Sequence, residues 1–247
     1  FAVAISTVVY PLIASHAARG DHGAMSTDFL KGIRLILIIN IPAAAGLALL
    51  AGPIVQLIFR HGLVTGPDAM EMGWLLAIMA VGLPFFSVVN LMVRAFYAVK
   101  DTKAPVRVAA IDFLINIGLS LLLIRYMGVF GIVLASTSAI IAQAVLLERS
   151  LRGRMPGMRL ASLLPSVGKI LGATAAMAAI VLAGKRGIAM ASLSPSAAAL
   201  AAVAGLIPAA VAAYGVALWV LRIEGRAEIS AVLARLPLAG RFFRRGL

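Results

Sequence analysis

Residues 33–59 read IRLILIINIPAAAGLALLAGPIVQLIF, with Arg34 as the single charged side chain. A helix needs about 20 consecutive apolar residues to cross the hydrocarbon core of a bilayer. The stretch exceeds that length, and it lacks the strict alternation of apolar and polar residues that marks the strands of membrane barrels. It therefore predicts a transmembrane α-helix.

Similar apolar runs follow along most of the chain. The complete runs cover residues 33–59, 72–97, 106–124, 128–147, 163–183 and 195–221, and a partial run covers residues 1–15. Each complete run is long enough to span a membrane as a helix. We expect an all-α, polytopic bundle of transmembrane helices with one partial and six full spans.

The composition points to the same class of protein. Hydrophobic residues make up 62% and charged residues 13% of the 247 residues, against about 45–50% and about 25% in soluble domains. These values exclude an ordinary soluble domain and a disordered chain, and the absence of cysteine excludes a disulfide scaffold and a thiolate site. Because Phe1 lies inside an apolar run with no basic segment before it, we expect a fragment without its N-terminal part and not a signal peptide.

Lysine and arginine fall between the apolar runs. Eighteen of the 22 lie in alternate connections and in the tail, so the positive-inside rule predicts that these connections and the C-terminus are cytoplasmic. Membrane orientation thus accounts for the net charge of +13. We expect no nucleic-acid partner, because the charges of a nucleic-acid-binding protein would gather on one polar face. Residues 223–247 form a basic amphipathic tail that either lies on the inner leaflet or is solvated.

Asp112 is the most unusual residue within an apolar run. A carboxylate at such depth is costly, and it is usually paired or functional. Asn116 follows one helical turn later on the same face, and Thr137 stands in the next run. We expect these three side chains to converge and to bind a sodium ion or relay a proton. The alternative is a hydrogen-bonded cluster that holds the helices together.

The segment 94–106 ends one span and starts the next, and it carries Arg94, Lys100 and Lys103 at the membrane edge. These cations are expected to contact lipid headgroups or to form a cytoplasmic gate, while Asp101 caps the next turn or pairs with Lys103. The alternative is a plain basic loop. No catalytic triad pattern, glycine-rich phosphate motif or metal-ligand spacing occurs in the sequence, so we expect neither an enzyme nor a bound cofactor or metal.

Prolines lie well inside three of the runs, at Pro42, Pro84 and Pro208. Proline bends a helix and removes a backbone donor. Such kinks suit either a transporter that opens alternately to each side of the membrane or a static bundle.

Several short motifs follow one another in an order typical of a known family. They are VYPLIASHAARGD at 9–21, IPAAAGL at 41–47, LIFRHG at 57–62, RAFYA at 94–98, KDTKAPV at 100–106 and GIVLAST at 131–137. With these motifs the chain resembles the C-terminal half of the MurJ/MviN lipid II flippases, in the multidrug/oligosaccharidyl-lipid/polysaccharide exporter superfamily. Beyond about residue 150 the resemblance rests on topology alone.

The resemblance implies a fourteen-span transporter, of which this chain would hold the end of the eighth span and the ninth to fourteenth spans. Members carry lipid II, the undecaprenyl-linked peptidoglycan precursor, from the inner to the outer leaflet of the bacterial cytoplasmic membrane by alternating access. Their main headgroup site lies outside the matched part, and their last two spans flank a groove for the lipid tail. Residues 1–150 would then be C-terminal-lobe helices, 151–222 two additional spans, and 223–247 a cytoplasmic tail.

Related functions remain open at this point. A related polysaccharide-lipid flippase or a multidrug/cation antiporter would share the spans, and a non-transporting scaffold would share them without a polar cavity. A flippase breaks no bond, but it needs two conformations and a driving force. Sodium, protons or the membrane potential would supply that force, at about 2.3 kcal/mol per charge per 100 mV. Its partners would be lipid II and the surrounding membrane lipids.

Overall fold

The computed structural model describes residues 2–59, 64–155, 158–191 and 193–221, and the predicted tail at 223–247 lies outside these residues. The helices are α1 (Ala2–Ala18), α2 (His22–Phe59), α3 (Gly66–Ala98), α4 (Lys103–Met127), α5 (Val129–Arg152), α6 (Leu164–Met190), α7 (Pro195–Ala201) and α8 (Ile207–Val220). A 3-10 turn (Leu160–Leu163) precedes α6, and a π-helical turn (Ala202–Leu206) joins α7 to α8. No strand occurs in the described ranges.

Six helical segments are long and apolar enough to cross a membrane, and the shorter apolar helix at Ile5–Ala18 precedes them. This confirms the prediction of one partial and six full spans. The start of the first full span differs from the prediction, because α2 begins at His22 and not near residue 33. Its 38 residues correspond to about 57 Å at about 1.5 Å per residue, so the polar first turns extend beyond an apolar layer of about 30 Å.

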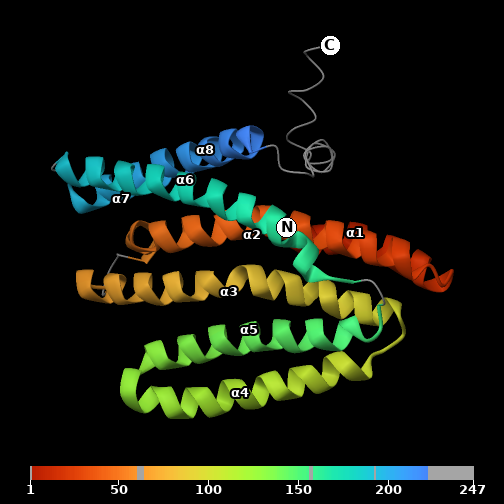
Figure 1. Ribbon diagram of the computed structural model, residues 1–247. Helices are drawn as coiled ribbons and strands as arrows, with labels where there is room; N and C mark the ends of the chain where they lie inside the picture. Colours follow the sequence, from red (N-terminus) through yellow and green to blue (C-terminus); the bar gives the residue numbers. More distant parts are fainter. Residues whose placement is uncertain (1, 60–63, 156–157, 192, 222–247) are drawn as a thin grey trace.

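The long helices lie side by side in one extended row (Figure 1). Contacts between helices give the order α4, α5, α3, α2 and α6, with α8 packed against α6. α1 packs on both α2 and α3. α2 is therefore the boundary between a larger bundle and the C-terminal helices.

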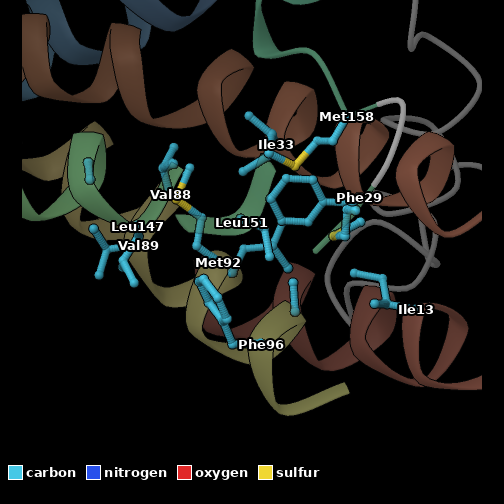
Figure 2. Close-up of a cluster of buried hydrophobic side chains, with 14 of the residues drawn as sticks. Ile13, Phe29, Ile33, Val88, Val89, Met92, Phe96, Leu147, Leu151 and Met158 are labelled. Atoms are coloured by element: carbon cyan, nitrogen blue, oxygen red, sulfur yellow. The ribbon is translucent and has the colours of Figure 1, made fainter. Parts of the chain in front are cut away.

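The main hydrophobic core lies where α1, α2, α3 and α5 meet (Figure 2). Phe29 and Phe96 are its largest side chains, and both are fully buried. Met158, in the segment that leads from α5 to α6, packs into the same cluster. A much smaller cluster of Leu50, Met177, Val181 and Ala210 lies between α2 and the C-terminal helices.

The α4–α5 connection is a tight antiparallel hairpin. Gly128 has a φ of 56°, a left-handed conformation in which glycine is the least strained residue. Gly131 lies so close to α4 that an added Cβ would come within 2.5 Å of the Leu123 carbonyl carbon and oxygen. These two glycines bring α5 against α4 and fix which residues of the two helices meet.

Prolines lie in the interior of α2 at Pro42 and Pro53 and in that of α3 at Pro84. Pro208, in contrast, lies in the first turn of α8, directly after the π-helical turn. A proline is tolerated there because the first turn of a helix lacks intrahelical acceptors for its N–H groups. The run 195–221 is thus one apolar span with an irregular centre.

Candidate functional site

A polar pocket of about 400 Å³ lies between α1 and α3. Asn90, Val93, Arg94 and Tyr97 line it from α3. Their spacing of i, i+3, i+4 and i+7 places them on one face of the helix. Tyr10 of α1 completes the lining. The pocket is close to the end of α3 that leads into the connection with α4.

Arg94 is half-buried in this pocket. Among the described residues, no carboxylate lies within ion-pair distance of its guanidinium group. Asn90 uses one amide hydrogen to bond the Phe86 carbonyl oxygen at 3.0 Å, which leaves its other polar positions available. A partly buried guanidinium group beside an amide and two phenols suits an anionic ligand such as a phosphate group.

Lys100 and Lys103 do not join this pocket, since both are exposed on the α3–α4 connection. The connection is shaped instead by Asp101. One of its carboxylate oxygens, Oδ1, accepts hydrogen bonds from the backbone N–H groups of Lys103 and Ala104, each at 3.1 Å. Oδ2 pairs with Arg154, from the segment after α5. The prediction that Asp101 caps α4 is confirmed, but its charged partner is Arg154 and not Lys103.

The surroundings of Asp101 stabilise its charged form. The backbone N–H of Ala104 is the largest influence, and the Arg154 guanidinium group also contributes, so that the pKa of the Asp101 carboxyl lies below its usual value. Arg154 also lies over the Phe96 ring, 5.5 Å from its centre. The connection between α3 and α4 is therefore tied to the main core at the edge of the bundle.

The expected convergence of Asp112, Asn116 and Thr137 is wrong for Thr137. Its hydroxyl donates to the Ile78 carbonyl oxygen at 3.5 Å, so it faces α3. Asn116 donates instead to Ser136 Oγ at 3.1 Å. Successive helix residues point about 100° apart, and here Ser136 contacts α4 while Thr137 contacts α3.

Asp112 does not join that hydrogen-bonded group. Its side chain is half-buried, and Oδ1 is fully buried without a hydrogen-bond partner. Ser120 extends the group by donating to Asn116 Oδ1 at 3.4 Å. Within the described ranges, no group of three histidine or carboxylate side chains is arranged to hold a metal.

An apolar groove of about 530 Å³ separates α2 from α6 and α8. Its α2 wall contains Pro42, Gly46 and Leu50, and its other walls include Met177 of α6 and Tyr214 of α8. The small residues of these helices leave the groove open. The family resemblance implied a groove beside the last two spans, and the alanine- and glycine-rich character of these spans is compatible with it.

Comparisons with known proteins agree with this architecture. The family model for lipid II flippase MurJ matches residues 1–203. A probable lipid II flippase MurJ from Rhizobium meliloti is 30% identical over 214 residues, which cover 86% of this chain and 40% of that protein. The corresponding protein from Haemophilus influenzae is 34% identical over 157 residues, or 61% of this chain and 31% of that protein.

The fold is also similar to a solved structure of lipid II flippase MurJ in its inward closed conformation. The TM-score is 0.71 at 23% sequence identity, over 93% of this chain and 44% of the other. The chain spans less than half the length of each of these three relatives. The family match extends beyond the last recognisable motif, at 131–137, and takes in α6 and α7. The chain belongs to the MurJ family of lipid II flippases.

Proposed function

We propose that the protein moves lipid II from the inner to the outer leaflet of the bacterial cytoplasmic membrane by alternating access. The observation that carries this proposal is the family match over residues 1–203. Six membrane-spanning segments and a shorter apolar helix are suited to the task. Because translocation breaks no covalent bond, the protein acts as a transporter and needs no catalytic residue.

The two cavities suit the two parts of such a lipid. In this proposal the apolar groove between α2, α6 and α8 receives the polyprenyl tail, because its lining is almost entirely hydrocarbon. The polar pocket receives an anionic part of the headgroup, with Arg94 as the principal charge. Lys100 and Lys103 lie outside the pocket and act more weakly, by attracting anionic lipid headgroups to the membrane surface.

The proposed orientation has the C-terminus and the α3–α4 connection in the cytoplasm. This orientation rests on the distribution of lysine and arginine, because 18 of these 22 residues fall in the connections and tail assigned to the cytoplasm. The proposed division follows the fold: residues 1–150 form lobe helices, 151–222 two additional spans, and 223–247 the basic tail. The Arg94 pocket would then open toward the leaflet in which the substrate is synthesised.

Transport in one direction needs two conformations and an external driving force to which their exchange is coupled. We propose that Asp112 senses a sodium ion, a proton or the membrane potential, since it is the carboxylate within the span of α4 and one of its oxygens has no protein partner. Asn116 is one turn away on the same helix. Thr137 is left out of this proposal, because its hydroxyl contacts the Ile78 carbonyl oxygen of α3.

Controlled depletion of the full-length protein in its natural host tests the proposed function. Lipid II exposed on the outer leaflet should fall while total lipid II rises, and re-expression should reverse both changes. An unchanged outer-leaflet pool would overturn the proposal. If another undecaprenyl-linked glycolipid accumulated instead, the protein would be a related polysaccharide-lipid flippase, and loss of drug resistance alone would indicate an antiporter.

A further inference from the structure

Two prolines in α2 each leave a backbone carbonyl without its helical donor. Ile38 precedes Pro42 by four residues, and Leu49 precedes Pro53 by four residues. In a regular helix the carbonyl of residue i accepts from the N–H of residue i+4, which proline lacks. Inside an apolar layer no water replaces that donor, so both carbonyl oxygens need another partner.

Side chains of the C-terminal helices supply both missing donors. The Tyr214 hydroxyl of α8 donates to the Ile38 carbonyl oxygen at 2.7 Å. The Lys185 ammonium group of α6 donates to the Leu49 carbonyl oxygen, also at 2.7 Å. Both donors are half-buried. Each bond joins residues that are more than a hundred positions apart in the chain.

The two bonds lie on the face of α2 that lines the apolar groove. Ile38 and Leu49 are eleven residues apart, which is about three turns, so their positions nearly coincide around the helix. Ile38 belongs to the α2 wall of the groove, which extends to Ile54, and Leu49 directly precedes the lining residue Leu50. Tyr214 itself forms part of the opposite wall.

Apolar packing between α2 and the C-terminal helices is sparse by comparison. The buried residues at this boundary form two small clusters, one of Leu50, Met177, Val181 and Ala210 and one of Ile38 and Ile170, and neither contains a buried aromatic side chain. Lipid tails are as apolar as these side chains, so apolar contacts discriminate weakly between helix and lipid neighbours. Directional hydrogen bonds to fixed carbonyls therefore have a larger share in setting the position of α6 and α8.

We propose that Lys185 and Tyr214 are positioning residues that bind the proline-freed carbonyls of Leu49 and Ile38 and thereby set the width of the apolar groove. Pro42 and Pro53 create the acceptors, and the two donors hold α6 and α8 against them. The proposal depends on the proposed function only in the identity of the lipid that enters the groove.

Restoring the missing backbone donor tests the role of Lys185. Spin labels at Tyr126 and Val216, both exposed and on opposite sides of the bundle, report the position of α8 in the full-length protein in nanodiscs. Lys185→Met should broaden the distance distribution between the labels. In a Pro53→Ala background the substituted residue regains a backbone N–H that can bond the Leu49 carbonyl oxygen, so adding Lys185→Met should broaden the distribution much less.

Lys169→Met is the matched control, because Lys169 is an exposed lysine of the same helix. It should leave the distance distribution unchanged in both backgrounds. Equal broadening by Lys185→Met with and without Pro53→Ala would overturn the role of Lys185. An unchanged distance distribution in the Lys185→Met single variant would also overturn this role.

Tyr214→Phe, alone and combined with Pro42→Ala, applies the same test to Tyr214, since phenylalanine keeps the ring and removes the donor. Binding of undecaprenyl phosphate to the full-length protein supplies a second readout. The single variant should weaken it about threefold, the size of an average interhelical hydrogen bond in a membrane. Pro42→Ala, whose new N–H takes up the same acceptor, should weaken it to a similar extent, and the double variant should show no further loss. If the parent protein fails to bind this lipid, the proposed function fails, while the distance measurement still decides the positioning role.

Discussion

The bundle of α1, α2, α3 and α5 and the pair of α6 and α8 are held in different ways. The bundle has a core with two fully buried phenylalanines and several methionines. The C-terminal pair meets α2 through two small buried clusters and two side-chain bonds to backbone oxygens. A large interdigitated core resists deformation, whereas a few directional contacts can be exchanged. The bundle is therefore suited to hold the polar pocket, and the C-terminal pair to border a groove that accepts ligands of varied shape.

Phe96→Ala should have the largest effect, because it disrupts the hydrophobic core of the bundle. The side chain is fully buried, and its loss removes the surface on which Arg154 lies. We expect destabilisation of about 3–5 kcal/mol, as for other buried phenylalanines, measured by denaturant unfolding in detergent. Phe113→Ala is the control, since Phe113 is 62% exposed; equal losses from both variants would contradict the described core.

Arg94→Gln should give the next largest effect and should act on transport. Loss of charge-assisted hydrogen bonds, about 1.5–3 kcal/mol, predicts a roughly ten- to hundredfold weaker apparent affinity for lipid II, with unfolding little changed. Lys100→Gln should have a mild effect, because Lys100 lies outside the pocket. A loss of flipping in Lys100→Gln with nearly normal Arg94→Gln would show that the pocket is misassigned.

Asp112→Asn tests whether the intramembrane carboxylate couples transport to an ion or only supports packing. We expect the dependence of flipping on sodium or pH to change, with an effect on unfolding below about 1 kcal/mol because the amide retains most contacts. Flipping by the parent and variant should be compared across sodium concentrations and pH. Identical profiles would leave Asp112 a purely structural role.

Asp101→Asn should have the smallest effect, and the effect should depend on pH. Because the pKa of the Asp101 carboxyl is lowered in the fold, its stabilising contribution is present above the ordinary value of about 3.9. That contribution is lost as pH falls through the lower folded-state pKa. The melting temperatures of parent and variant should differ at pH 7 and converge below about pH 4. Glu71→Gln, an exposed site on α3, should show no such convergence.

The apolar runs are sufficient to predict the number and order of the spans, because each span must be apolar over the thickness of the membrane. They do not predict where a helix ends outside the membrane, so the polar turns of α2 from His22 were missed. Helix capping by Asp101 is local and was predictable. The family was also accessible, because its motifs are ordered along residues 1–150.

Contacts between helices were less predictable. Asn116 of α4 bonds Ser136 and not Thr137 because of the way α5 is rotated against α4. The close approach at Gly131 determines that rotation. The prolines that free the two α2 carbonyls are visible in the sequence. Their donors, Lys185 and Tyr214, are 136 and 176 residues away from the acceptors, so no local pattern identifies them.

Photo-crosslinking to lipid II tests most directly whether the groove beside the C-terminal helices binds the lipid tail. A benzophenone amino acid at Val211, in the groove, and another at Leu114, exposed on α4, compare two apolar surfaces of the full-length protein. We expect saturable crosslinking of the lipid II tail at Val211, reduced by unlabelled lipid II, and only weak, non-saturable crosslinking at Leu114. Equal and non-saturable crosslinking at both positions would contradict a tail-binding role for the groove.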